Sequence, residues 1–252
     1  MSLPPPYPGE DRSYRRLSGV PHLPTFEIRV EETDLRVQAR LELRDRCREK
    51  VIEAREALGR YIRSHPHFLK TTEPWRLAGP APALVRLMTE ASLKTGVGPM
   101  AAVAGAIAET VGRDLLEVSD EVVVENGGDI FLSLRSESVI GLYAGASPLS
   151  LRIGIRMPGG LGPCGVCTSS GTVGHSMSRG RADAACVMAP SAALADAAAT
   201  AVANRVSKED EIAPAIEWAR NLADVQGVVV VKSAKIGMWG AMEIVPLKGK
   251  RG

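Results

Sequence analysis

A dense group of chemically useful side chains lies between Cys167 and Gly180, where hydroxyls, glycines, a thiol and a histidine follow one another closely. Glycine lets the backbone turn so that its N–H groups point at a bound anion, and hydroxyls add donors and acceptors in little space. The composition therefore predicts a ligand-binding loop, although a plain Gly- and Ser-rich connector has a similar composition. Its candidate binding residues are Thr168, Ser169, Ser170, Gly171, Thr172, Gly174 and Ser176.

A second candidate site lies on the alanine-rich segment 192–204. Asp196, Thr200 and Asn204 recur at intervals of four residues, so on a helix they project from successive turns of nearly one face. A carboxylate, a hydroxyl and an amide on an otherwise apolar surface suit a hard cation, which prefers oxygen ligands. We therefore take Asp196 and Thr200 as candidate metal ligands.

The segment Asn126-Gly127-Gly128 separates two runs of β-branched and aromatic residues, which is a strong signal for a β-hairpin. The bare glycine backbone could border a site that Asp129 and Glu125 reach. The turn by itself explains the asparagine and the glycines, so the sequence leaves the role of the two carboxylates open.

Two further groups of residues suggest metal or redox chemistry more weakly. Cys164 and Cys167 form a C-x-x-C pair, but the sequence has neither a second such pair nor a thioredoxin-like context. A Cys-based redox protein is therefore the weaker alternative. His65 and His67 flank a proline at the end of a predicted helix, which favours capping or exposure over metal binding.

Composition excludes several classes of protein. The apolar fraction of 45% predicts a folded core, and the aromatic fraction of 4% predicts a core of small side chains. A net charge of +2, without a long basic run, makes nucleic acid a poor partner. The low-charge stretch 95–108 is too short to span a membrane, and the N-terminus lacks the features of a secretory signal. We expect a cytoplasmic protein.

The chain divides into two parts of unequal size. Residues 1–20 are rich in proline and charge and predict a flexible N-terminal arm. Residues 21–252 are expected to form a single α+β domain. Pro99 predicts the start of a buried helix over 100–108, whose first N–H groups form either an anion site or only a packing surface.

Periodicity predicts the elements that position the candidate residues. Helices are expected over 43–64, 80–94, 100–108, 192–204 and 209–219. Strands are expected over 26–30, 35–39, 122–124, 130–134, 138–143, 151–157, 183–188, 228–231 and 242–245. The irregular order of strands and helices favours an α+β fold with antiparallel or mixed sheets, packed with a buried small-residue helix and flanking helices.

Four motifs in this order resemble an uncharacterised protein family distantly related to the ApbE proteins, the FAD:protein FMN transferases. The motifs occupy 97–105, 125–130, 167–178 and 194–200, and the resemblance extends over about 14–206. In ApbE proteins, a Gly-Gly-Asp strand turn, a Thr-Ser-Gly segment, a histidine segment and an Ala-Asp-x-x-x-Thr helix line a flavin site that holds magnesium.

The resemblance implies an ApbE-like fold with a site for FAD or FMN and Mg²⁺. Asp196 and Thr200 match the metal-ligand positions of the helix motif, and Gly127, Gly128 and Asp129 match the strand turn. The other matching residues are Thr168, Ser169, Ser170 and His175.

The implied activity is FMN transfer or cleavage of the FAD pyrophosphate, with His175 or Asp129 handling a proton. The chain departs from ApbE in two motifs: an Asp-Pro-x-Thr-Gly segment is replaced at 175–180, and a Lys-Gly helix motif at 101–105. The alternative is a flavin-binding module without turnover, acting as a partner of a reductase system. Expected partners are a nucleotide ligand, an acceptor or reductase protein, and a second copy of the chain.

Overall fold

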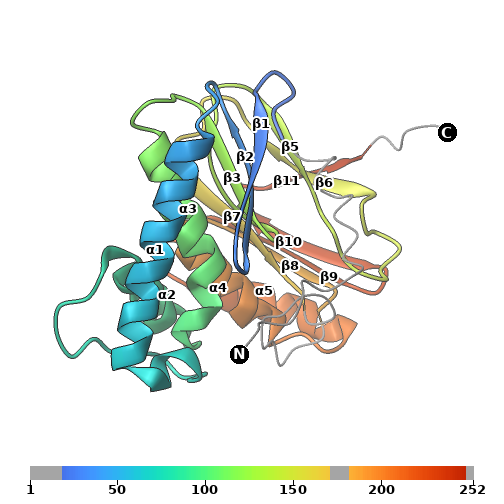
Figure 1. The fold of residues 1–252 in the computed structure, drawn as a ribbon. Helices are drawn as coiled ribbons and strands as arrows, with labels where there is room; N and C mark the ends of the chain where they lie inside the picture. Colours follow the sequence, from blue (N-terminus) through green and yellow to red (C-terminus); the bar gives the residue numbers. More distant parts are fainter. Residues whose placement is uncertain (1–18, 171–181, 248–252) are drawn as a thin grey trace.

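The computed structural model describes residues 19–170 and 182–247 (Figure 1). In these ranges the chain forms an eight-stranded sheet in the order β1-β2-β3-β4-β7-β8-β9-β10 and a three-stranded sheet in the order β11-β6-β5. Every neighbouring pair of strands in both sheets is antiparallel. The architecture is the α+β arrangement that the irregular element order predicts.

The elements have the following bounds. The strands are β1 (Thr25–Val30), β2 (Thr33–Ala39), β3 (Val122–Asn126), β4 (Asp129–Ser133), β5 (Ser138–Gly141), β6 (Ile153–Met157), β7 (Cys164–Ser169), β8 (Ala184–Ala189), β9 (Gly227–Lys232), β10 (Lys235–Gly240) and β11 (Glu243–Pro246). The α-helices are α1 (Arg44–Ser64), α2 (Ala83–Thr95), α3 (Val103–Leu115), α4 (Ala192–Ala203) and α5 (Ile212–Arg220). Short 3₁₀ turns are η2 (Pro66–Leu69), η3 (Pro99–Ala102) and η4 (Glu209–Glu211).

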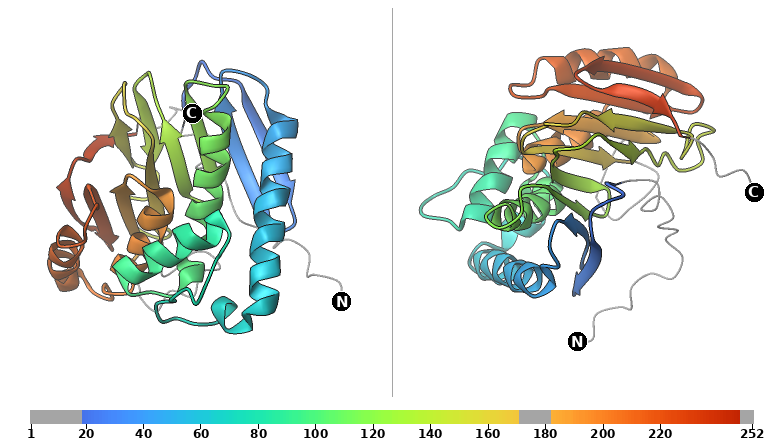
Figure 2. Two further views of the ribbon diagram at one scale, coloured as in Figure 1. Left: turned by 90° about the vertical axis from the view of Figure 1, so that its left-hand side faces the viewer. Right: turned by 90° about the horizontal axis from the view of Figure 1, so that it is seen from above.

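The larger sheet separates the hydrophobic clusters on its helix-covered face from the cluster that lies between the two sheets. The helix-covered face carries one cluster under α1 to α4 and another between α4, α5 and strands β8 and β9. Phe131 of β4 is buried on the face that the helices cover, whereas the next residue, Leu132, is buried on the face that the smaller sheet covers. This alternation follows from the two-residue period of a strand. Figure 2 shows the helices and the smaller sheet on opposite sides of the larger sheet.

Most of the predicted elements are present. The β1–β2 hairpin, the long helix α1, the β3–β4 hairpin and the alanine helix α4 occur close to where periodicity predicts them. These elements have strong local signals, namely alternation, helical spacing and an Asn-Gly turn.

Three predictions need correction. Pro99 opens the 3₁₀ turn η3, and helix α3 starts only at Val103 because Ala102 has a φ of −114° that interrupts helical geometry. Residues 167–169, which we expected in a loop, form the end of strand β7. Strand β10 was not predicted, because its sequence, Lys-Ile-Gly-Met-Trp-Gly, does not alternate polar with apolar residues.

The described chain begins packed against the rest of the fold. Gly19 forms an isolated bridge with Val139, and Val20 is fully buried in the core between the sheets. The remainder of the predicted arm, 1–18, lies outside the described residues. Of the helices in the described ranges, none is long and apolar enough to cross a membrane.

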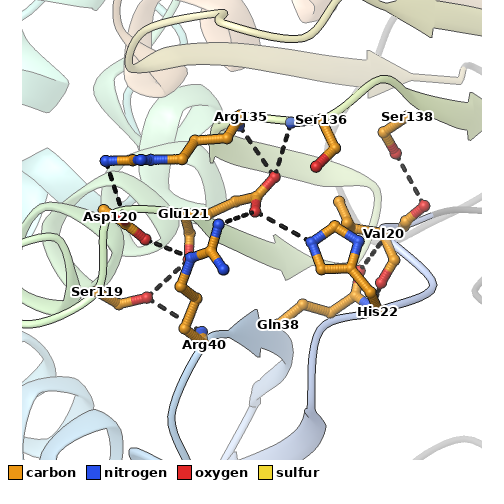
Figure 3. A network of polar contacts seen from close by, with 11 residues as sticks. Val20, His22, Gln38, Arg40, Ser119, Asp120, Glu121, Arg135, Ser136 and Ser138 are labelled. Atoms are coloured by element: carbon orange, nitrogen blue, oxygen red, sulfur yellow. Dashed lines mark hydrogen bonds and ion pairs between the residues drawn. The ribbon is translucent and has the colours of Figure 1, made fainter.

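The buried carboxylate of Glu121, directly before β3, joins three segments (Figure 3). Its Oε1 accepts hydrogen bonds of 3.0 Å from the backbone N–H groups of Arg135 and Ser136, and its Oε2 lies 3.3 Å from Arg40 Nη2 and from His22 Nε2. Burial opposes ionisation of this carboxyl group, but the two N–H donors and His22 outweigh it and lower its pKa. Glu121 therefore fixes the β4–β5 connection to the segments before and after the β1–β2 hairpin.

Candidate functional site

The β3–β4 hairpin positions the first carboxylate of the site. Gly127 and Gly128 have φ values of +65° and +106°, which glycine adopts without strain, and Asp129 follows as the first residue of β4. Asp129 pairs across the ladder with Cys167 of β7. The turn therefore places the Asp129 carboxyl group near the end of β7.

Helix α4 positions the second carboxylate. It lies against β7 and β8, and all its residues are buried, including Asp196 at 8% exposed and Thr200 at 5%. At its N-terminus the buried Glu109 accepts hydrogen bonds from Ser191 Oγ at 2.7 Å and from the Ala193 N–H at 3.4 Å. The Glu109 carboxylate thus accepts a hydrogen bond from a free N–H group in the first turn of α4, where a negative charge is favourable.

Two glycines let α4 approach its neighbours closely. A Cβ atom on Gly105 of α3 would lie 2.2 Å from Ala192 O and 2.8 Å from Asp196 Cβ. A Cβ atom on Gly165 of β7 would lie 2.2 Å from Ala192 Cα. Both positions therefore require glycine. Together they fix how closely α4, which carries Asp196, packs against α3 and β7.

Asp196 also caps the start of helix α3. Its Oδ2 accepts a hydrogen bond of 2.9 Å from the Gly105 N–H, and the Ala104 N–H donates to the same carboxylate. We expected the first N–H groups of this helix either to bind an anion or only to pack. In the structure, the N–H groups of Ala104 and Gly105, in the first turn of α3, donate to the protein's own Asp196 side chain.

The two carboxyl groups influence each other electrostatically. Burial raises the pKa of Asp196 to about 7. Hydrogen bonds from the Gly105 and Ala104 N–H groups lower this pKa, but they offset only part of the effect of burial. Burial also raises the pKa of Asp129 well above its usual range, and the nearby Asp196 charge acts in the same direction. Within the described ranges, no lysine or arginine contributes to either pKa.

A thiol and two hydroxyls complete this group on the helix-covered face. Cys167 donates a hydrogen bond from Sγ to Ala192 O at 3.4 Å, and burial together with the two aspartates raises its pKa, so the thiol stays neutral. Thr200 Oγ1 donates to Ser169 Oγ at 3.5 Å. We call Asp129, Cys167, Ser169, Asp196 and Thr200 the carboxylate site.

The structure separates other candidates from the carboxylate site. Thr168 lies between Cys167 and Ser169 on β7, so its side chain lies on the opposite face, where it hydrogen-bonds to the Cys186 thiol. Glu125 is on that face too, because it pairs with Ile130 of the core between the sheets. The sequence left the role of Glu125 open. The strand geometry places its side chain on the opposite face from Asp129, although its charge still contributes to the raised pKa of Asp129.

The C-x-x-C pair is also divided by the sheet. Cys164 lies in the core between the two sheets, whereas Cys167 lies in the core under the helices. Residues three apart on a strand face opposite sides, so these two thiols cannot form a disulfide or share a metal. This geometry argues against the Cys-based redox alternative.

Several predicted residues lie outside the described residues. These are Gly171, Thr172, Gly174, His175 and Ser176, which belong to the segment 171–181. Ser170, the last described residue before this segment, is half-buried.

Sequence reasoning missed two residues beside the site. Cys167 was counted in the candidate loop and in the C-x-x-C pair but was not chosen as a site residue, although alternation along 164–169 could have placed it with Ser169. Asn126 was taken as a turn residue, but its Nδ2 donates to Ala104 O at 3.1 Å and so links the hairpin to α3. That contact had no signal in the sequence, because it joins distant segments.

The donor set fits a hard cation with few protein ligands. The carboxylate and hydroxyl oxygens of Asp129, Asp196, Thr200 and Ser169 are ligand types that Mg²⁺ prefers, and Mg²⁺ typically takes one or two carboxylates together with water and phosphate. The described ranges contain no group of three or more His, Cys, Asp or Glu side chains that could hold a metal ion.

A protein-family model described as "AbpE bacteria" matches residues 17–235. The chain belongs to this family. It is 43% identical to a UPF0280 protein of Methanococcus vannielii, over 77% of this chain and 81% of that protein. It is 42% identical to a UPF0280 protein of Methanothermobacter thermautotrophicus, over 82% of each chain.

Solved structures show the same fold at low sequence identity. The apo form of Pseudomonas stutzeri flavinyl transferase ApbE has a TM-score of 0.56 at 14% identity, covering 86% of this chain and 94% of that one. The ApbE protein of Thermotoga maritima has a TM-score of 0.53 at 14% identity, covering 86% and 96%. The predicted distant relation to ApbE and the ApbE-like fold are thus confirmed.

Proposed function

We propose that the chain binds a flavin nucleotide, FAD or FMN, or a related phosphorylated ligand, together with Mg²⁺ at the carboxylate site. The observation that carries this proposal is the pair of buried aspartates, Asp129 and Asp196. Burial opposes the ionisation of both, the Asp196 charge opposes that of Asp129 further, and no described basic side chain offsets these effects. A divalent cation supplies the missing positive charge. The flavinyl transferase named among the solved structures supports a flavin as the ligand.

Asp196 and Thr200 would hold the metal. The two side chains lie one helical turn apart on α4, and the Gly105 N–H fixes the Asp196 carboxylate through Oδ2. Bound Mg²⁺ would supply a Lewis acid that neutralises pyrophosphate charge. The Thr200 hydroxyl, now bonded to Ser169, would turn its oxygen to the metal.

Asp129 would handle a proton in the reaction. Burial and the nearby Asp196 charge raise the pKa of this carboxyl group well above its usual range, which favours the protonated form that can donate to a departing phosphate oxygen. His175 is the second candidate for this role. The Ser169 and Ser170 hydroxyls, with Gly127, Gly128 and the glycine-rich residues after 170, would donate hydrogen bonds to phosphate.

Two reactions are consistent with such a site. FMN transfer breaks the FAD pyrophosphate, joins FMN to a hydroxyl of an acceptor protein and releases AMP. Hydrolysis breaks the same bond with water and releases FMN and AMP. AMP release is therefore common to both reactions, and acceptor modification distinguishes them.

The proposal is tested by incubating the protein with FAD and Mg²⁺ and separating AMP, FMN and flavin-labelled protein by chromatography. We expect AMP release by the wild type and a loss of about 100-fold or more in Asp196→Asn, because Asn keeps an oxygen for the Gly105 N–H but removes the charge that binds the metal. Asp120→Asn, which removes the charge of a surface aspartate paired with Arg40 and Arg135, is the matched control and should retain activity.

A binding module without turnover is the second candidate function. Ala104 stands where the ApbE motif carries its lysine, and its carbonyl is bonded to Asn126. A module would bind FAD with Mg²⁺-dependent affinity in calorimetry yet release no AMP, and its partner would then be a reductase system. Equal behaviour of wild type and Asp196→Asn in both assays would refute the metal assignment, and a protein that takes up no flavin would refute both functions.

A further inference from the structure

The eight-stranded sheet ends in two edge strands of different character, β1 and β10, which lie at opposite ends of the molecule (Figure 2). The exposed residues of β1 are Thr25, Glu27 and Arg29. Charged side chains on an edge strand oppose pairing with a strand of another molecule. The β1 edge is therefore protected.

Strand β10 exposes large apolar side chains instead. Ile236 is 40% exposed and Met238 is 46% exposed. A Cβ atom on Gly237 would lie 2.6 Å from Ile212 and 2.7 Å from Ile216 of α5, so Gly237 points toward the helix. By alternation, Ile236 and Met238 lie together on the face away from α5. Among the residues that the structure describes, β10 pairs with β9 along one edge and with no strand along its other edge.

We propose that two copies of the chain pair antiparallel through their β10 strands, about a two-fold axis at Gly237, and so form one continuous sheet. This axis sets Ile236 against Met238 of the partner subunit, and Met238 against the partner's Ile236. Each exposed apolar side chain thereby covers another one, as cross-strand pairs do within a sheet. The inference does not depend on the proposed flavin site.

The sequence of β10 favours a second copy over an unrelated strand. Lys235 is the only charged residue of the strand, and the Gly237 axis sets it against Trp239 of the partner subunit rather than against another lysine. A cation beside an aromatic ring is favourable, whereas two lysines would repel. An axis at Met238 would instead set Ile236 against the partner's Gly240 and lose one apolar pair.

Oligomeric state is the first test, measured by sedimentation equilibrium of the full chain over a range of concentrations. We expect a wild-type dimer and an increase of at least about tenfold in the dimer dissociation constant for Met238→Lys, since a charge would be buried in the interface. Glu27→Lys on the opposite edge is the matched control and should remain dimeric. A monomeric wild type, or a dimer that Met238→Lys leaves unchanged, overturns the proposal.

Disulfide trapping tests the register. Directly opposite residues have Cα atoms about 4.5–5.5 Å apart, within disulfide reach, whereas diagonal neighbours are about 7–8 Å apart. Ile236→Cys mixed with Met238→Cys should therefore cross-link on oxidation, and neither variant alone should do so. Wild type is the control, because its four cysteines, Cys47, Cys164, Cys167 and Cys186, are all buried. Equal cross-linking of either variant with itself contradicts the Gly237 axis.

Discussion

At the residue scale, the chemistry of this protein depends on which face of one strand a side chain occupies. Cys167, Thr168 and Ser169 follow one another on β7, yet only Cys167 and Ser169 lie on the face that carries Asp196. Thr168 is bonded to Cys186 on the other face. Three adjacent residues that could all donate a hydrogen bond to a ligand therefore have different surroundings, because successive side chains of a strand point to opposite faces of the sheet.

This difference predicts unequal effects of two conservative substitutions. Ser169→Ala removes a hydroxyl that contacts Thr200, and we expect it to weaken Mg²⁺-dependent FAD binding by about 10-fold, equivalent to one lost hydrogen bond to a charged group. Thr168→Val, on the opposite face, should change that affinity by less than about twofold. Calorimetric titration of both variants with FAD and Mg²⁺ checks this; the reverse order of effects would assign the binding role to Thr168.

At the element scale, two close contacts decide where the site lies. The N-terminus of α3 is bonded to Asp196 of α4, and α4 lies against Gly105 and Gly165 without room for a side chain. The hairpin that carries Asp129 is tied to the same helix start through Asn126 and Ala104. The packing of α3, α4 and β4 therefore forms the carboxylate site as a unit.

A methyl group added between the helices should disturb both packing and metal binding. We expect Gly105→Ala to destabilise the protein by about 1–3 kcal/mol, because its Cβ would clash with Ala192 O and Asp196 Cβ, and to reduce stabilisation by Mg²⁺. Gly59→Ala in α1 is the matched control: the nearest atom to its Cβ is Arg63 Nη1 at 3.5 Å, so it should stabilise by about 0.4–1 kcal/mol. Thermal and urea unfolding with and without Mg²⁺ measure both effects; equal shifts in the two variants would contradict the tight crossing.

The Glu121 network predicts a dependence of stability on pH. The folded protein lowers the pKa of this carboxyl group, so its contribution is present above the usual value of 4.5 and is lost as the pH falls through the lowered value. We expect Glu121→Gln to lower the free energy of unfolding by about 1–3 kcal/mol at pH 7 and by much less at pH 3. Urea unfolding at both pH values measures this.

The neighbouring Asp120 supplies the control for that experiment. Its carboxylate is 44% exposed and pairs with Arg40 and Arg135 at the surface. Asp120→Asn should therefore change stability by no more than about 1 kcal/mol at pH 7. A Glu121→Gln effect that is the same at pH 3 and pH 7 would show that the charge of Glu121 does not contribute.

At the scale of the whole molecule, the large sheet separates the hydrophobic clusters on its helix-covered face from the cluster between the two sheets, and the carboxylate site lies on the helix-covered face. The helices pack on the face that carries Asp129 and Cys167, whereas the three-stranded sheet packs on the other face. Changes on the two faces should therefore act independently, since each side chain of a strand points to one face of the sheet.

A pair of matched substitutions tests this independence. Ile107→Val removes a methylene group from the helix-side core, and Ile155→Val removes one from the core between the sheets. Each should lower the free energy of unfolding by about 0.5–1.5 kcal/mol, and the double variant should equal their sum within about 0.5 kcal/mol. Urea unfolding of the three variants measures this, and a larger interaction energy would mean that the sheet couples the two cores.

The sequence by itself determined the features that depend on neighbouring residues. The four-residue spacing of Asp196 and Thr200, the Asn-Gly turn before Asp129 and the periodicity of the long helices are all local patterns, and the structure contains the corresponding elements. The α+β class followed from their order. These features are predictable because hydrogen bonds within a helix or a tight turn join residues close together in the chain.

Only the tertiary structure decided which of these residues meet. The pairing of Asp129 with Cys167, the capping of α3 by Asp196 and the separation of Thr168 from Ser169 all depend on strand register and helix docking between distant segments. A shift of one residue in the β4–β7 register would exchange the two faces of β7 without changing a local pattern. The composition of the candidate site was therefore readable from the sequence, whereas its assembly required the packed sheet and helices.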